Sequence, residues 1–170
     1  DEAKKFEGAE VSEKDCEGRM DLRALPIFTI DSAETKDIDD AISLPGQSRK
    51  TSGYGWRTDP MGGLGDDFHI GNDLAAAQGT PVLAAADGVV RMAGSHKSYG
   101  NYLRILHADG DETLYAHMQY LFVKAGECVT AGQILGTVGE TGNATGPHLH
   151  FEILHRGLRY DPAEALQNAS

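Results

Sequence analysis

Two histidines separated by one residue, His148 and His150, give the clearest indication of a chemical site. Side chains two positions apart in a β-strand point to the same side of the sheet, so both imidazoles face one surface and Leu149 faces the other. Pro147 fits the start of such a strand, because proline is not tolerated inside a hydrogen-bonded ladder. Neutral imidazole is a favoured zinc ligand, so the pair indicates a metal site; an incidental pair of strand histidines is the alternative.

The segment HIGND (69–73) adds an imidazole and a carboxylate four positions apart. Gly71 and Asn72 favour a bent loop over a helix, and in either conformation His69 and Asp73 can converge on one ion. Two imidazoles and one carboxylate form a catalytic zinc set that leaves the fourth position for water. Taken singly, Asp73 is better explained as a loop cap, and His69 as a partly buried aromatic ring.

The other four histidines carry weaker signals. His117 lies in LYAHMQY at the end of a predicted strand, and spacing alone assigns it no role. His96 lies in a polar loop, His107 lies at a junction of strand and turn, and His155 directly follows the last predicted strand. We interpret these last three as solvated or capping side chains.

Short β-strands would position these side chains. The turn signals ADG (86–88) and GNATGP (142–147) are typical of the segments between them. The spacing of strands, roughly 10–15 residues without long helical segments between them, favours antiparallel pairing over βαβ units. Six segments rich in β-branched and aromatic residues are the candidate strands, at 80–85, 88–93, 101–108, 112–118, 133–139 and 148–154.

The predicted fold class is therefore all-β: an antiparallel sheet or sandwich with a groove, a short terminal helix and an extra N-terminal segment. The groove would be floored by the strands that carry His117, His148 and His150. Helix is expected only at 2–7 and at 161–167, where Asp161 would cap a helix that begins with a proline.

Four blocks of the chain resemble the lysostaphin/LytM-type zinc endopeptidases, in the same order and with the same spacing. The resemblance covers about residues 53–163. The blocks are FHIGNDLAAAQGTPVLAAADGVV (68–90), YGNYLRILHADGDETLYAHM (99–118), VTAGQILGTVGETGNATGPHLHFEI (129–153) and YDP (160–162).

The resemblance implies which residues form the site. In this family H-x-x-x-D supplies two zinc ligands and the second histidine of H-x-H supplies the third, which gives His69, Asp73 and His150. The first histidine of H-x-H and the histidine that ends the Y-A-H block act beside the metal; these are His148 and His117. All five are present, which favours a catalytic over a degenerate member of the family.

The implied activity is zinc-dependent hydrolysis of peptide bonds in the stems or cross-links of bacterial peptidoglycan, in the periplasm or outside the cell. One imidazole would accept a proton and the other would stabilise the oxyanion, and the sequence does not say which does which. The alternative is a non-enzymatic envelope protein that binds wall peptides or regulates another wall hydrolase.

Glycine-rich loops would line the groove, at 53–55, 62–65, 98–101 and 139–146.

The first 45 residues differ from the remainder, since they hold 13 of the 26 acidic residues but only 2 of the 21 glycines. PGQSRKTSGYG (45–55) has the composition of a linker. We therefore divide the chain into an N-terminal segment, 1–48, and a lysostaphin-type peptidase domain, 49–170.

The stretch RMDLRALPIFTIDSAETKDIDDAISL (19–44) resembles the start of the catalytic domain of ribonuclease II/R-type exoribonucleases. That motif places four aspartates at a magnesium site, and the matching positions are Asp31, Asp37, Asp39 and Asp40. The rest of that nuclease domain does not follow in this sequence. We interpret the aspartates as a charged loop or edge strand without nuclease activity, with a vestigial magnesium site as the alternative.

The chain has 170 residues and a formal net charge of −11. This acidity repels nucleic-acid phosphates, so we expect no nucleic-acid partner. No apolar run approaches the roughly 18–20 residues of a membrane span, and the opening DEAKKFEGAE lacks the apolar stretch of a secretory signal. Cys16 and Cys128 are too few for a disulfide framework or a cysteine-based zinc site. The sequence does not indicate the oligomeric state.

Overall fold

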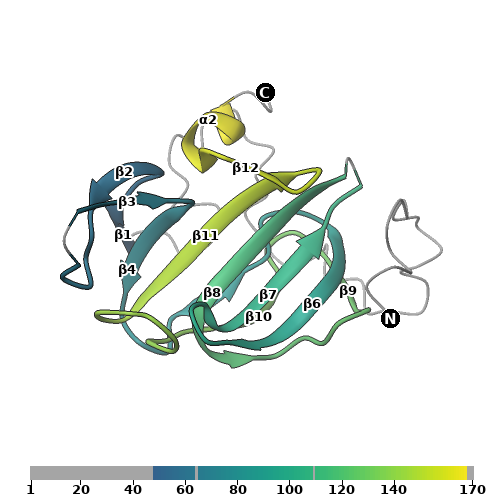
Figure 1. Cartoon of the computed structure of the whole chain (residues 1–170). Helices are drawn as coiled ribbons and strands as arrows, with labels where there is room; N and C mark the ends of the chain where they lie inside the picture. The colour runs from purple at the N-terminus through teal and green to yellow at the C-terminus, as the bar shows by residue number, and fades with distance from the viewer. Residues whose placement is uncertain (1–47, 64, 109, 168–170) are drawn as a thin grey trace.

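The computed structural model describes residues 48–63, 65–108 and 110–167, and antiparallel β-strands dominate this part of the chain. Ten of its strands form one sheet, and the hairpin of β2 (Gly55–Thr58) and β3 (Asp66–His69) forms a second (Figure 1). The main path of the large sheet runs through β1 (Ser48–Ser52), β4 (Asn72–Ala76), β11 (His148–His155), β8 (Asp111–Leu121), β7 (Gly100–Leu106), β6 (Gly88–His96) and β9 (Cys128–Val129).

Three further strands join this path from the side. Strand β10 (Ile134–Val138) pairs with β8 and with β5 (Pro81–Leu83), and β12 (Leu158–Tyr160) pairs with β11. All pairings are antiparallel, so the predicted all-β class is confirmed. Within the described ranges no helix is long and apolar enough to cross a membrane.

The predicted C-terminal helix is present as α2 (Pro162–Gln167). Asp161 caps it, because the backbone N–H of Ala163 donates to Asp161 Oδ1 at 2.9 Å. The helix expected at 2–7 lies outside the described residues, as do the four aspartates of the nuclease-like motif.

Strand β11 shows how the sequence divides its two faces. Leu149, Phe151 and Ile153 alternate along it and enter the main hydrophobic core, whereas His150 and Glu152 are buried on the opposite face. The strand therefore has core packing on one face and the candidate site on the other. The largest apolar side chains that complete the core are Leu74, Leu103, Ile105, Tyr115, Met118 and Leu135.

Strand β8 departs from this alternation at His117. Tyr115 and Met118 lie three positions apart, yet both pack in the main core. Leu103 on β7 pairs with Tyr115 and Asn101 pairs with Met118, so a two-residue step on β7 faces a three-residue step on β8. This is a β-bulge, and His117 adopts a left-handed backbone conformation there with φ of 61°. The bulge turns His117 away from the core.

The linker predicted at 45–55 is wrong from Ser48 onward. Residues 48–52 form β1, which pairs with β4, and β2 begins at Gly55. β1 is an edge strand whose side chains are exposed or half-buried. It is held to β4 by backbone hydrogen bonds, which do not require alternating apolar side chains. The sequence signal for a strand is therefore weak at this position.

Tyr115 offers a test of this packing, because its hydroxyl is buried in the core and accepts a hydrogen bond from the backbone N–H of Ala85 at 2.8 Å. Tyr115→Phe leaves that buried N–H without its acceptor, so we expect the free energy of unfolding to fall by about 1–3 kcal/mol. Denaturant titration measures this change. Tyr120→Phe, in the same strand but 60% exposed, is the control and should unfold like the wild type; equal midpoints for the two variants would contradict the assignment.

Candidate active site

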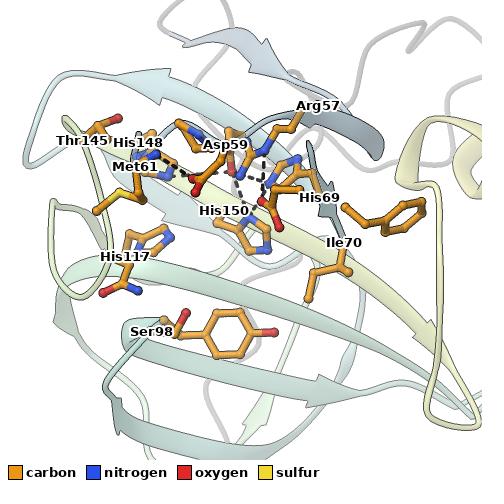
Figure 2. Close-up of a pocket in the computed structure, with 16 residues that line it drawn as sticks. Arg57, Asp59, Met61, His69, Ile70, Ser98, His117, Thr145, His148 and His150 are labelled. Carbon is orange, nitrogen blue, oxygen red and sulfur yellow. Dashed lines mark hydrogen bonds and ion pairs between the residues drawn. The ribbon is translucent and has the colours of Figure 1, made fainter. Parts of the chain in front are cut away.

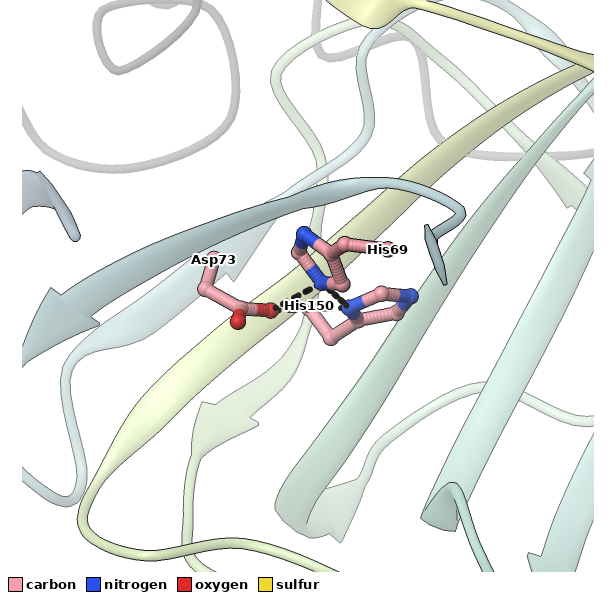
Figure 3. A group of neighbouring side chains, drawn as sticks. All are labelled: His69, Asp73 and His150. Carbon is pink, nitrogen blue, oxygen red and sulfur yellow. Dashed lines mark hydrogen bonds and ion pairs between the residues drawn. The ribbon is translucent and has the colours of Figure 1, made fainter. Parts of the chain in front are cut away.

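Three side chains from separate parts of the chain place one atom each around a single point (Figure 3). His69 Nε2 lies 3.0 Å from Asp73 Oδ1 and 3.1 Å from His150 Nδ1, and the latter two atoms are 2.8 Å apart. Zinc bonds of about 2.0–2.1 Å in tetrahedral geometry place neighbouring ligand atoms about 3.3 Å apart. The observed triangle is therefore close to the size that a zinc ion requires.

Strand pairing and one tight turn produce this triangle. Asp73 on β4 and His150 on β11 are direct partners in the antiparallel register. His69 ends β3 and Asn72 begins β4, so the expected bent loop is present between them. Gly71 is needed in that turn, because a Cβ there would lie 2.3 Å from the carbonyl oxygen of Phe151.

The second ring nitrogen of each histidine fixes its tautomer. His69 Nδ1 donates to the carbonyl oxygen of Gly53 at 2.8 Å, and His150 Nε2 donates to Glu152 Oε1 at 3.1 Å. In a neutral imidazole the other nitrogen then presents its lone pair, so both inner nitrogens face the centre as electron-pair donors. Together with the Asp73 carboxylate they form a donor set that suits a cation, and zinc in particular.

Asp73 is strongly biased toward its ionised form. Burial opposes this, but hydrogen bonds with His150 and His69 outweigh burial and hold the pKa of Asp73 well below its usual range. Its second oxygen, Oδ2, accepts a hydrogen bond from Arg57 Nη1 at 2.9 Å, which leaves Oδ1 directed at the centre. Arg57 Nε also lies 3.6 Å from Asp67 Oδ2. Arg57 belongs to β2 and was not among the site residues predicted from the sequence.

Positive charge is favoured at the centre. Burial alone would lower the pKa of His150, but the hydrogen bonds and charges of Asp73 and Glu152 raise it above its ordinary value. The two carboxylates that stabilise a proton on this ring also stabilise a metal cation beside it. A proton and a metal ion would compete for the same nitrogen.

Glu152 is a buried member of the site that the sequence analysis did not identify. Its carboxylate accepts hydrogen bonds from Tyr99 Oη at 2.6 Å, from His150 Nε2 at 3.1 Å and from Arg159 Nε at 2.6 Å. Burial would raise the pKa of Glu152, but these three donors lower it, so the carboxylate is ionised. The available signal was strand alternation, which places residue 152 on the same face as the two histidines of H-x-H.

His117 and His148 lie beside the triangle, with ring centroids 4.6 Å apart. His117 Nδ1 donates to the carbonyl of Thr141 and His148 Nδ1 donates to that of Gly146, both at 2.8 Å. Burial lowers the pKa of His117 to about 4, so this ring is neutral near pH 7 with a lone pair on Nε2. His148 Nε2 lies 3.8 Å from Asp73 Oδ1.

All five predicted histidine and aspartate positions border one groove of about 410 Å³. In Figure 2, His150 lies between His117 on one side and His69 on the other. Two of the four glycine-rich loops, 98–101 and 139–146, line this groove as expected. Loop 53–55 instead supplies the Gly53 carbonyl that holds His69, and the described residues of 62–65 do not line the groove. The remaining lining residues are Arg57, Asp59, Pro60, Met61, Asp67, Phe68, Ile70, Ser98, Tyr99, Asn143 and Thr145.

The other histidines have structural partners and do not line this groove. His107 is buried, not solvated, and bonds to the Asp87 carbonyl and to Thr113, each at 2.8 Å. His155 pairs with Asp111, and His96 is exposed and accepts a backbone hydrogen bond within its own loop.

Comparison with known proteins identifies the family. The sequence profile described as Peptidase family M23 matches residues 67–162, more than half of the chain. The chain is 45% identical over 115 residues to the DD-carboxypeptidase/endopeptidase Mpg of Neisseria meningitidis, a match that covers 68% of this chain and 26% of that protein. The chain thus spans about a quarter of the length of this curated relative.

Solved structures agree with the sequence match. A zinc-containing peptidase from Vibrio cholerae aligns with a TM-score of 0.67 at 34% identity, over 79% of this chain and 39% of that one. The catalytic domain of lysostaphin from Staphylococcus simulans aligns with a TM-score of 0.64 at 36% identity, over 70% of this chain and 92% of that domain. The resemblance read from the sequence is confirmed, and the chain belongs to Peptidase family M23.

Proposed function

We propose that this chain is a zinc-dependent endopeptidase that hydrolyses peptide bonds in the stems or cross-links of bacterial peptidoglycan. One observation carries the proposal. Three electron-pair donors, from His69, Asp73 and His150, meet within 3.1 Å of one another at the floor of a groove, and two further imidazoles face the same groove. The names of the matched relatives, including the peptidoglycan DD-endopeptidase ShyC of Vibrio cholerae, support the substrate class.

In this proposal His69, Asp73 and His150 hold the zinc ion. Zinc bound there supplies a Lewis acid that polarises a peptide carbonyl and lowers the pKa of water to about 7. The three side chains are held ready for this role by Gly53, Arg57 and Glu152, so little rearrangement is needed when the ion enters.

His117 and His148 are the proposed catalytic residues. His117 is neutral, and its Nδ1–H is committed to a carbonyl, so Nε2 is available to accept a proton from the attacking water. The same ring can then give the proton to the leaving amine. His148 Nε2 lies near the centre. Because Nδ1–H of this ring is committed to the Gly146 carbonyl, His148 stabilises the negative charge on the carbonyl oxygen only in its protonated form, which has an N–H at Nε2.

The site's activity would place the protein where peptidoglycan is found, in the periplasm or outside the cell. A non-enzymatic envelope protein that binds wall peptides is the competing function. The groove contains both a complete donor set and two further imidazoles, and a binding protein needs neither. Hydrolysis of purified sacculi therefore decides between the two functions.

The roles of the five side chains can be separated by substitution. We expect Asp73→Ala and His150→Ala to lose both bound zinc and hydrolysis, because each removes a ligand. His117→Ala and His148→Ala should retain zinc and lose about 10²–10⁴-fold in rate, the usual size of acid–base catalysis. Elemental analysis and the release of soluble fragments from sacculi measure the two properties. His96→Ala is the control with both intact, and zinc lost on His117→Ala would contradict the assignment.

Metal removal tests the proposal on the unaltered chain. Chelation should abolish fragment release from sacculi, and added zinc should restore it, because His117 can accept a proton from water but cannot supply the Lewis acid that polarises the carbonyl. Magnesium added to the chelated protein serves as the control and should restore nothing, since the donor set has two imidazoles. Wall binding without fragment release at saturating zinc would favour the non-enzymatic function.

We also propose that the N-terminal segment is a separate, non-catalytic unit, and that the boundary precedes β1. Removal of residues 1–47 keeps β1 whole and should leave zinc content and hydrolysis as in the full chain. Asp39→Asn, within the nuclease-like motif, should likewise change neither property. Loss of solubility on removal of 1–47 would show that the segment belongs to the core.

A further inference from the structure

We propose that Glu152 is a positioning residue for the metal centre, which holds His150 in the tautomer that binds the ion and which is itself held by Arg159 and Tyr99. This inference rests on the proposed function, because it takes His150 as a zinc ligand. It adds a residue that touches neither ion nor substrate but sets how firmly the ion is held.

The first argument is the burial of Glu152. Its side chain is fully buried, with 0% exposure, on a strand whose neighbouring residues on that face are His150 and Leu154. A buried carboxylate is costly unless it is paired and hydrogen-bonded. Burying Glu152 beside a candidate ligand therefore costs desolvation free energy, which a hydrophobic residue at this position would not cost.

The second argument is the orientation of its two oxygens. Oε1 accepts from His150 Nε2 at 3.1 Å, and this bond commits the proton of the ring to the outer nitrogen. The inner nitrogen, Nδ1, then faces Asp73 and His69 as a lone pair. A carboxylate bonded to the outer nitrogen also makes the ring a better electron-pair donor, which strengthens its bond to a metal.

The third argument is that Glu152 has its own support. Oε2 accepts from Arg159 Nε at 2.6 Å, and Oε1 also accepts from Tyr99 Oη at 2.6 Å. Arg159 Nη2 donates in turn to Tyr99 Oη at 3.2 Å, which closes a ring of three side chains. The carboxylate is thus fixed in position by Arg159 on β12 and by Tyr99, which precedes β7.

The hairpin between β11 and β12 brings Arg159 to this place. Arg156 and Gly157 both have positive φ, of 50° and 81°, as a two-residue type I′ turn requires. The turn reverses the chain so that Arg159 pairs with Leu154 in the ladder, and its side chain reaches back to Glu152.

The chain contains a matched control for this test. Glu112 on β8 is also buried, at 4% exposure, and its oxygens pair with Arg91 at 2.6 Å and with Arg104 at 2.8 Å. Glu112 and Glu152 are therefore both arginine-paired, buried carboxylates of the same sheet. Only Glu152 bonds to a proposed zinc ligand.

The experiment compares Glu152→Gln with Glu112→Gln in the full chain. Zinc affinity is measured by competition with a chromophoric chelator, and stability by thermal unfolding of the chelated proteins. We expect both variants to lose stability, but only Glu152→Gln to lose zinc affinity, by about 10–100-fold. Equal zinc affinity for the two variants would overturn the proposal and make Glu152 a structural ion pair only.

A second pair of variants keeps the test decisive if Glu152→Gln does not fold. Arg159→Met removes the support of Glu152, and Arg104→Met removes the matching support of Glu112. Zinc affinity should fall for Arg159→Met alone, and an equal affinity in both would again overturn the proposal. Wild-type protein that binds no zinc would instead refute the proposed function, so the two failures are distinct.

Discussion

Three electron-pair donors held about 3 Å apart repel one another unless a positive charge lies between them. His69, Asp73 and His150 are in this position, and the rest of the site keeps them there. The Gly53 carbonyl and the Glu152 carboxylate each accept a hydrogen bond from the outer ring nitrogen of one histidine. The centre therefore needs a positive charge, which either a proton in a hydrogen bond to Asp73 or a metal cation can supply.

The sequence predicted the parts of the site that depend on local geometry. Strand alternation placed His148 and His150 on one face, and β11 has this arrangement. The Gly71 turn was expected to bend the chain between His69 and Asp73, which it does. Both expectations use periods or turn preferences that a few neighbouring residues determine. The same alternation would have pointed to Glu152, had it been extended by one step.

Other parts depend on contacts between distant segments and could not be derived from spacing. Regular alternation would direct His117 into the core beside Tyr115, and only the bulge in β8, set by its register with β7, turns it to the groove. Arg57 and Arg159 reach the site through hairpins whose position follows from the whole sheet. The edge strand β1 lacks an apolar pattern, so its composition predicts a linker instead of a strand.

The arginines at the centre have a consequence for its electrostatic field. Four carboxylates and two guanidinium groups line the groove or bond to the donor set; they belong to Asp59, Asp67, Asp73 and Glu152, and to Arg57 and Arg159. Their formal charges sum to −2. A divalent ion seated there would bring this sum to zero. Within a protein of net charge −11, the floor of the groove would then repel anionic groups less than the surrounding surface does.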